Sequence, residues 1–341
     1  FCCHRCRSVL IELPYQSYAR HLGSVYGSRV YRIGVDALFS CPNRHSDGTG
    51  GCAFCDGRGS SAVYHRTEEH ALSRLGFTGD DVACASNVAT KSLGERIGLI
   101  QSQIERGKAF VKRRYKAQRF SLYFQSYTNT YDSIENLKAL FDAALTCGPF
   151  VEFIVSTRPD CLSEQVVELL ASYTDQVEKV WVEIGLESAN QCSLDLLGRN
   201  HDTECYIRAV EALHLRSIGV CTHVMLGLPY EGRDDYLATA RLVNRVHSDA
   251  VKIHNLHVCT GTRLDAWHRQ GEVCTASLKR HVSDCIFFLR HLEGSVVIER
   301  MMCETPSHRR VSPRSFPDKH QFLEQVTRSM QTHGWVQGDL V

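Results

Sequence analysis

Short apolar segments alternate with longer segments of helical periodicity over most of the chain, and this alternation limits the possible folds more than any other feature. Each apolar segment is rich in β-branched or aromatic residues, as β-strands are. The six candidate strands are 31–38, 120–125, 151–156, 179–185, 219–226 and 250–257. Strands that alternate with helices predict an α/β fold with a parallel sheet and right-handed crossovers.

The intervening segments have helical spacing and suitable N-caps. Ile134, Leu137 and Phe141 recur on one helical face after Ser133, and a second apolar stripe at 166–170 follows Ser163. A closed eight-stranded barrel needs two more strands. The sequence therefore predicts an open, partial (βα)6 TIM-like barrel.

Three regions divide the chain. Residues 1–28 form an N-terminal segment, residues 29–274 the barrel domain, and residues 275–341 a short α+β C-terminal extension. We expect the extension to contain a helix, a short strand at 296–299 and a terminal helix near 318–333, and to cover part of the barrel mouth. Residues 56–91 are a long insertion with interspersed glycines, and such insertions usually serve function.

Composition narrows the class of protein. The net charge of +1 gives no overall attraction to nucleic acid or to an anionic membrane. No stretch of about 18 apolar residues and no signal peptide are visible, so we expect a cytoplasmic protein without a membrane partner. Most of the 16 cysteines stand singly in apolar periodic segments, where free cysteine behaves as a small buried hydrophobe.

Three cysteines are grouped differently. Cys41, Cys52 and Cys55 follow the first candidate strand in a C-x10-C-x2-C pattern, with a glycine-rich turn between Cys41 and Cys52. Cysteine thiolates are the usual ligands of iron–sulfur clusters. Three ligands on a [4Fe–4S] cluster leave one iron open, as a catalytic zinc site leaves an open position.

Other metal sites are compatible with the spacing. A structural zinc ion could be bound by the same cysteines with His45 or His65 as the fourth ligand. The position after the first strand of a βα barrel favours a catalytic centre over a structural one. A second candidate site, made of Cys2, Cys3, His4 and Cys6, lies at the beginning of the chain.

Six motifs, each at the C-terminal end of a candidate strand, resemble those of the radical S-adenosylmethionine (SAM) superfamily. Within it the chain is similar to the bacterial family related to the Elongator catalytic subunit, over roughly residues 31–272. The motifs are CPNR…GGCAFC (41–55), YFQSYTNTY (123–131), STRPDCL (156–162), VEIGLES (182–188), HVMLGLP (223–229) and KIHNLHVCTGTRL (252–264).

This resemblance implies two cofactors, a [4Fe–4S] cluster and S-adenosyl-L-methionine. The open iron would chelate the amino and carboxylate groups of SAM, and one electron from the cluster would release a 5′-deoxyadenosyl radical. It further implies an electron donor such as flavodoxin or ferredoxin. A tRNA wobble uridine is a candidate substrate by fold-level analogy alone.

The resemblance also implies residues that contact SAM. Phe54 would pack near the adenine, and Arg158 could bind the carboxylate where Ser156 replaces the glutamate of many relatives. Hydroxyl groups stand where relatives have a glycine-rich turn for the amino group. The candidate SAM-binding residues are Phe54, Ser126, Tyr127, Thr128, Arg158, Glu183, Glu187, Arg199 and His223.

Several of these residues have simpler interpretations. Asp160 could cap a turn, Glu183 could be a structural ion-pair partner, and His254 and His257 could be core histidines. The basic residues between 108 and 119 form a solvated helix face or contact RNA phosphate. Two other functional classes remain open: a radical SAM enzyme acting on a porphyrin or another small molecule, and a zinc- or cluster-stapled RNA-binding protein without catalysis.

Overall fold

The computed structural model describes residues 13–45, 49–57 and 91–341. The candidate second metal site at Cys2, Cys3, His4 and Cys6 lies outside these residues, as do His65 and most of the insertion at 56–91.

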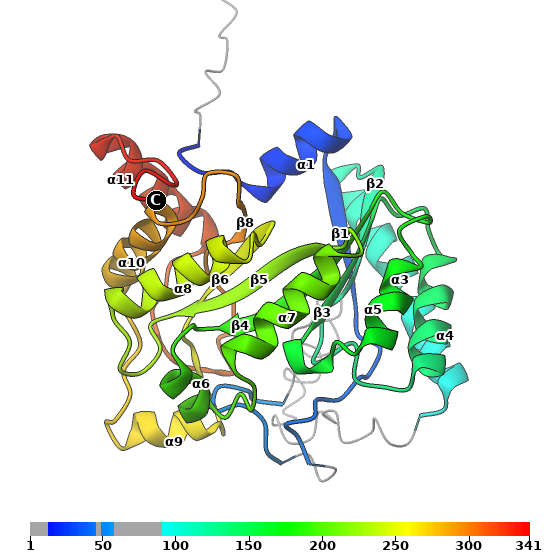
Figure 1. Ribbon diagram of the computed structural model, residues 1–341, viewed down its shortest axis with the longest axis horizontal. Helices are drawn as coiled ribbons and strands as arrows, with labels where there is room; N and C mark the ends of the chain where they lie inside the picture. Colours follow the sequence, from blue (N-terminus) through cyan, green and yellow to red (C-terminus); the bar gives the residue numbers. More distant parts are fainter. Residues whose placement is uncertain (1–12, 46–48, 58–90) are drawn as a thin grey trace, which may run out of the picture.

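Seven parallel strands form one curved sheet in the order β1-β2-β3-β4-β5-β6-β8. This arrangement confirms the partial barrel expected from the sequence (Figure 1). The strands are β1 (Val30–Val35), β2 (Arg119–Phe124), β3 (Glu152–Thr157), β4 (Lys179–Glu187), β5 (Gly219–Leu226), β6 (Ala250–Asn255) and β8 (Val297–Arg300). Strand β8, which the sequence analysis placed in the C-terminal extension, pairs with β6 and is the seventh strand of the sheet. The predicted domain boundaries stay predictions.

Strands β1 and β6 end where other local contacts replace the hydrogen bonds between neighbouring strands. Strand β1 stops at Val35 because Asp36 accepts a hydrogen bond from the Leu38 backbone N–H at 2.9 Å and Leu38 adopts a φ of 56°. Strand β6 stops at Asn255, and the next residues form β7 (Val258–Cys259), which pairs antiparallel with β9 (Arg310–Ser312). Both candidate strands are therefore shorter than the sequence predicts.

The helices begin at the polar residues that the sequence marks. Ser133 and Ser163 accept hydrogen bonds from backbone N–H groups of the first turns of α4 and α5, and Ser92 and Glu95 form a capping box on α3. The helices are α1 (Tyr18–Tyr26), α3 (Leu93–Tyr115), α4 (Ile134–Leu145), α5 (Glu164–Ala171), α6 (Gln191–Leu197), α7 (Thr203–His214), α8 (Arg233–Arg245), α9 (Arg263–Arg269), α10 (Leu278–Arg290) and α11 (Lys319–His333), with a short 3₁₀ turn, η2 (Pro159–Cys161). None of the helices in the described ranges is long and apolar enough to cross a bilayer.

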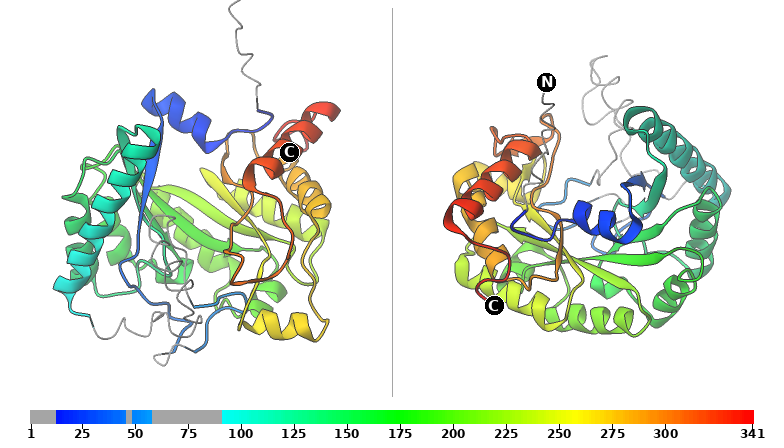
Figure 2. Two further views of the ribbon diagram at one scale, coloured as in Figure 1. Left: turned by 180° about the vertical axis from the view of Figure 1, so that it is seen from behind. Right: turned by 90° about the horizontal axis from the view of Figure 1, so that it is seen from above.

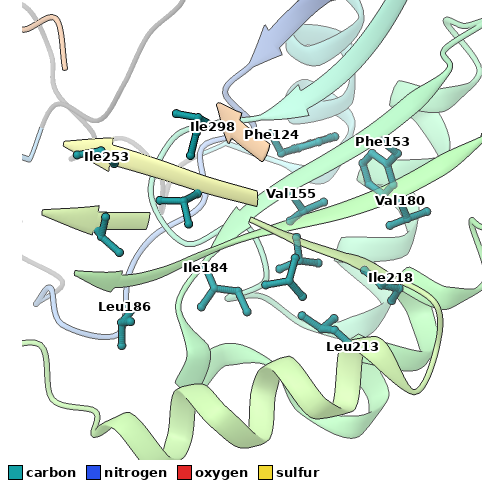
Figure 3. Packing of buried hydrophobic residues seen from close by; sticks show 14 of the residues in the cluster. Phe124, Phe153, Val155, Val180, Ile184, Leu186, Leu213, Ile218, Ile253 and Ile298 are labelled. Carbon is teal, nitrogen blue, oxygen red and sulfur yellow. The ribbon is translucent and has the colours of Figure 1, made fainter. Parts of the chain in front are cut away.

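The main core lies between the outer face of the sheet and the helices that surround it (Figure 2). Side chains such as Phe124, Phe153, Val155 and Ile253 alternate outward along their strands and are almost completely buried (Figure 3). Burial of the apolar side chains on the outer face stabilises the sheet, so the side chains on its inner face can be polar.

The inner face of the sheet is arranged in layers along the barrel axis. The N-terminal ends of the strands contribute a small apolar cluster that includes Ile154, Trp181 and Val297. Helix α1 covers this end of the barrel, at the upper edge of Figure 1. The C-terminal ends of the strands point to the opposite edge, where the loop after β1 and helices α6 and α9 gather (Figure 1). The candidate functional residues lie at this second edge.

Candidate functional site

A cavity of about 510 Å³ lies at the C-terminal edge of the sheet. Its walls include Cys41, Cys52 and Cys55 from the loop after β1, together with residues at the ends of β2 to β6. Phe54, between the last two cysteines, also lines it. Catalytic groups of βα barrels occupy this edge, so the location suits a reactive centre.

Two glycines allow the loop to bring the cysteines to one cavity. Gly50 and Gly51 have φ values of 83° and 93°, in the region that favours glycine. A Cβ on Gly50 would lie 2.7 Å from the Asn43 carbonyl oxygen, and that oxygen accepts a hydrogen bond from the Gly51 N–H at 2.6 Å. Larger side chains would therefore open the turn that separates Cys41 from Cys52.

Distant parts of the chain fix the cysteine loop. The Ala53 N–H donates to the Leu197 carbonyl at 2.8 Å, and the Ala53 carbonyl accepts from the Leu264 N–H at 3.0 Å. Arg309, from the segment after β8, donates to the Asp56 carboxylate from Nε at 2.7 Å. The loop is thus held by α6, by α9 and by the C-terminal extension.

Polar hydrogens approach two of the three thiols. The Cys52 Sγ lies 3.4 Å from Arg199 Nη1 and 3.5 Å from Asn43 Nδ2, and the Cys55 Sγ lies 3.9 Å from Arg44 Nη1. Burial raises the pKa of the free Cys55 thiol. Donors of this kind stabilise a thiolate, which is the form that binds metal.

The same part of the chain contains no ready-made site for a single metal ion. Among the described residues, no group of three or more His, Cys, Asp and Glu side chains is arranged to hold one. His45 is exposed and does not line the cavity. In a [4Fe–4S] cluster the irons and sulfides stand between the thiolates, so its cysteines need not converge on one point. All twelve cysteines of the described ranges are free thiols, and the donor set of Cys41, Cys52 and Cys55 fits such a cluster.

The three hydroxyl-bearing residues after β2 differ in whether they line the cavity. Tyr127 and Thr128 line the cavity, whereas Ser126 is buried beside it. Tyr127 has a φ of 60°, and its hydroxyl donates to the Gly57 carbonyl. The Thr128 N–H donates to the Ser40 carbonyl at 3.3 Å. The turn therefore packs against both ends of the cysteine loop.

Arg158, after β3, is already engaged by the protein. Its Nε and Nη2 contact the two oxygens of Asp160 at 2.8 and 2.9 Å, and Nη2 also donates to the Arg199 carbonyl. Asp160 thus pairs with Arg158. The Nη1 atom of Arg158 is buried without a partner in the described chain, and Arg158 and Ser156 both line the cavity. One donor of this guanidinium remains for a ligand.

Glu187 and Arg199 form the wall beside Cys52. Arg199 Nη2 donates to the Gly185 carbonyl at 2.7 Å and lies 3.8 Å from Glu187 Oε1. Glu187 follows a register shift between Gly185 and Glu187 and has a φ of 70°, and its side chain lines the cavity. Its Oε2 is buried and has no partner among the described residues. A buried carboxylate oxygen without a donor points to a ligand group.

Glu183 has a different environment, although it is only four residues earlier. It is fully buried, does not line the cavity and accepts from Arg32 at 2.9 Å and from Lys252 at 2.7 Å. Burial alone would raise the pKa of Glu183, but Lys252 and Arg32 hold it well below its usual range. We call the connected group the charge layer, and it consists of Arg32, Tyr123, Glu183, His223, Lys252 and Glu299.

His223 connects the charge layer to the cavity. Its Nε2 lies 2.8 Å from Glu183 Oε2, and the ring lines the cavity. Burial lowers the pKa of His223 despite the contact with Glu183. A neutral ring that donates from Nε2 presents an unprotonated Nδ1 as a hydrogen-bond acceptor.

The end of β8 and the segment after it supply a wall of the cavity that the sequence motifs did not identify. Arg300, Cys303, Thr305 and Arg309 all line the cavity. The Cys303 Sγ lies 3.1 Å from the Asn255 carbonyl oxygen. These residues follow no motif of the resemblance, and only the expectation that the extension covers the barrel mouth indicated them.

The basic residues between 108 and 119 lie away from this cavity. They occupy the C-terminal half of α3 and the start of β2, which is at the N-terminal edge of the sheet. Cations there also interact favourably with the carbonyl end of the helix. A substrate in the cavity is therefore at the opposite edge of the sheet from these side chains.

Two family models match the chain. The model described as radical SAM superfamily matches residues 101–243, and the Radical SAM C-terminal domain model matches residues 248–332. The chain belongs to the radical SAM superfamily, whose members typically use a [4Fe–4S] cluster and SAM. The cysteine loop precedes the residues matched by either model.

Full-length relatives extend the similarity to the cysteine loop. Uncharacterized protein MJ0486 of Methanocaldococcus jannaschii is 30% identical over 327 residues, which cover 95% of this chain and 91% of the relative. Uncharacterized protein YtqA of Bacillus subtilis is 29% identical over 330 residues, covering 96% of this chain and 92% of the relative.

Among solved structures, the fold is similar to that of archaeal Methanocaldococcus infernus Elp3 with an N-terminal deletion. The TM-score is 0.58 at 20% identity, and the match covers 72% of this chain and 62% of that chain. At this identity the similarity concerns the fold alone.

Proposed function

We propose that this protein is a radical SAM enzyme that cleaves SAM reductively and modifies a substrate by radical chemistry. The observation that carries the proposal is the meeting of three free cysteines at one cavity, with N–H donors directed at two of their sulfurs. Cys41, Cys52 and Cys55 would hold a [4Fe–4S] cluster. When bound, the reduced cluster supplies one electron that breaks the sulfonium bond of SAM, and the 5′-deoxyadenosyl radical takes a hydrogen atom from the substrate.

The residues of the chain would bind and orient SAM. Glu187 Oε2 is a free acceptor for the SAM amino group, and Arg158 Nη1 is a free donor for its carboxylate. Phe54 offers a ring for the adenine, and Tyr127 and Thr128 border the same space. Arg199 would keep the Cys52 sulfur charged, since its N–H faces that sulfur.

The substrate we propose is a tRNA wobble uridine. The support is the resemblance to the family of the Elongator catalytic subunit, which is an analogy of family and fold. A flavodoxin or ferredoxin would supply the electron. We expect these reactions in the cytoplasm, where the free thiols stay reduced.

Anaerobic reconstitution with iron and sulfide tests the first part of the proposal. We expect brown protein that forms 5′-deoxyadenosine from SAM after addition of dithionite. The variant with Cys41, Cys52 and Cys55 all changed to alanine should form none, whereas Cys192→Ala, at an exposed cysteine on α6, should match the wild type. Zinc-bound, colourless protein that binds RNA without cleaving SAM would instead support the non-catalytic alternative.

Mass spectrometry of tRNA nucleosides from a deletion strain tests the substrate. Loss of one modified uridine, restored by the wild-type gene and not by the triple cysteine variant, is the expected result. An unchanged nucleoside profile would remove tRNA as the substrate and leave SAM cleavage unaffected.

A further inference from the structure

One cation in the barrel interior, Arg300, has no ion-pair partner among the described residues. The charge layer contains Arg32 and Lys252, which are matched by Glu183 and Glu299 at distances from 2.7 to 3.5 Å. Arg300, at the end of β8, adds a third positive charge to the same region. No carboxylate in the described chain lies within ion-pair distance of Arg300, and its sequence neighbour Glu299 is already shared by Arg32 and Lys252.

The only hydrogen-bond partner of the Arg300 side chain among the described residues is a neutral ring. Arg300 Nη2 donates to His254 Nε2 at 2.8 Å, which requires an unprotonated nitrogen there. Burial and the charge of Arg300 hold the pKa of His254 well below its usual range. Since Nε2 accepts, the neutral ring carries its hydrogen on Nδ1 and offers a second donor.

The remaining donors of this pair are unused. Arg300 Nε is buried and has no partner in the described chain, and both Arg300 and His254 line the cavity. An uncompensated cation in a partly dehydrated site is unfavourable, and a bound anion removes that penalty. The planar fork of arginine matches carboxylate and phosphate groups in particular.

Arg300 and His254 are not among the residues assigned to the cofactors, although one of those residues, His223, is a neighbour. The cysteines follow β1, and the SAM candidates lie on the cysteine loop, after β2 and β3, and along β4 and β5. Arg300 and His254 come from β8 and β6, the last two strands of the order, and the His254 ring lies 5.2 Å from the His223 ring on β5. A substrate group bound there would face the same cavity as the cysteines without occupying the SAM contacts.

We infer that Arg300 and His254 form a subsite for a compact oxyanion of the substrate, a carboxylate or a phosphate group. This inference rests on the proposed function only in calling the ligand a substrate; the anion site itself does not depend on SAM cleavage. It assigns substrate selection to β6 and β8, outside the cysteine loop.

Anion binding to the full-length protein tests the subsite directly. Inorganic phosphate and acetate are titrated at constant ionic strength against chloride, with calorimetry and the thermal unfolding midpoint as readouts. We expect saturable binding of one of the two anions to the wild type, and the anion that binds identifies the source of the oxyanion. Arg300→Gln should weaken it by about ten- to a hundredfold. Arg300→Lys should be intermediate because it keeps the charge and loses the fork.

The control is Arg328→Gln, which removes one exposed positive charge on α11. It should bind as the wild type does, whereas equal binding by Arg300→Gln, or no saturable binding of either anion, would overturn the inference. Loss of folding is monitored by the unfolding midpoint without anion. Arg300→Gln should change this midpoint little, because it removes the bond to His254 together with a cation that has no ion pair.

Formation of 5′-deoxyadenosine separates this inference from the proposed function. The triple cysteine variant should bind the anion as the wild type does and form no 5′-deoxyadenosine. If Arg300→Gln loses SAM affinity, Arg300 serves the SAM carboxylate and the substrate subsite is disproved. If the wild type binds the anion and never cleaves SAM, the proposed function fails while the anion site stands.

Discussion

The charge layer and the cysteine cavity are both polar and partly buried, but their glutamates, Glu183 and Glu187, differ in how completely the protein satisfies them. The charge layer also has buried atoms without a hydrogen-bond partner in the described chain, Arg32 Nε and Glu299 Oε2. In the charge layer, Glu183 accepts from Arg32, Tyr123, His223 and Lys252. At the cavity, Glu187 Oε2, Arg158 Nη1 and Arg300 Nε are buried and lack partners in the described chain. Satisfied groups maintain the barrel, and convergent unsatisfied groups indicate where ligands bind.

Of the substitutions that test this comparison, Glu183→Ala should lower the free energy of unfolding most. A small loss of stability would contradict the contrast between the charge layer and the cavity. The substitution leaves Arg32 and Lys252 without their shared carboxylate inside the barrel. Breaking a buried ion pair by removing one partner costs about 3–5 kcal/mol. Urea unfolding measures the loss, with Glu187→Gln as the control, which we expect to lower the free energy of unfolding by less than about 1 kcal/mol because its Oε2 accepts no hydrogen bond.

Lowering the pH should destabilise the folded protein through His257, which lines the cavity. Burial and the charges of Arg310, His281 and Arg300 lower the pKa of His257 to about 3, whereas an unfolded histidine titrates at about 6.5. Between these values the unfolded chain binds a proton that the folded protein does not, so stability falls as the pH falls through this window.

The size of that effect is measurable by substitution. Each pH unit below 6.5 should remove about 1.4 kcal/mol more from the wild type than from His257→Gln. His320→Gln, at an exposed position on α11, should follow the wild type. Unfolding curves at several pH values give the slopes, and parallel slopes for His257→Gln and the wild type would contradict the prediction.

Gly185→Ala tests the cavity wall beside Cys52, and we expect it to lower the free energy of unfolding less than Glu183→Ala does. A Cβ at position 185 would lie 2.7 Å from Arg199 Nη2, so the guanidinium, whose Nη1 contacts the Cys52 sulfur, must shift. Overpacking of this kind costs about 1–3 kcal/mol. Mass spectrometry should show a changed alkylation rate at Cys52 in the metal-free protein. Gly98→Ala, in α3 with nothing within 4 Å, should instead stabilise the protein, by about 0.5–1 kcal/mol.

The smallest change in stability is expected for substitutions at the N-terminal edge of the sheet, opposite the cavity. The double substitution Arg113→Gln and Arg114→Gln removes two exposed charges from the C-terminal end of α3. Stability should change by no more than about 0.5 kcal/mol. SAM cleavage should be unchanged, since these residues lie far along the strands from the cavity. A loss of cleavage would show that the two edges are coupled.

The sequence predicted the architecture because strand and helix periodicities are local. All six candidate strands are present, and Ser133 and Ser163 cap the helices that they were expected to begin. The strand at 296–299 was also expected, but its pairing with β6 was not, because a four-residue segment carries no information about its neighbours.

The site was less accessible to sequence reasoning because its chemistry depends on distant partners. Glu183 was compatible with a cofactor contact or an ion pair, and only Arg32 and Lys252, 151 and 69 residues away, distinguish the two environments. The wall containing Arg300 and Cys303 carries no motif. Its position follows from tertiary contacts that no local pattern records.

The bond between Asp56 and Arg309 joins residues 253 positions apart, and it has a consequence for biogenesis. While the ribosome is still translating β6, the cysteine loop has been synthesised, but the segment that clamps it has not. The pocket therefore cannot acquire its final walls until Arg309 has been synthesised and has left the ribosome.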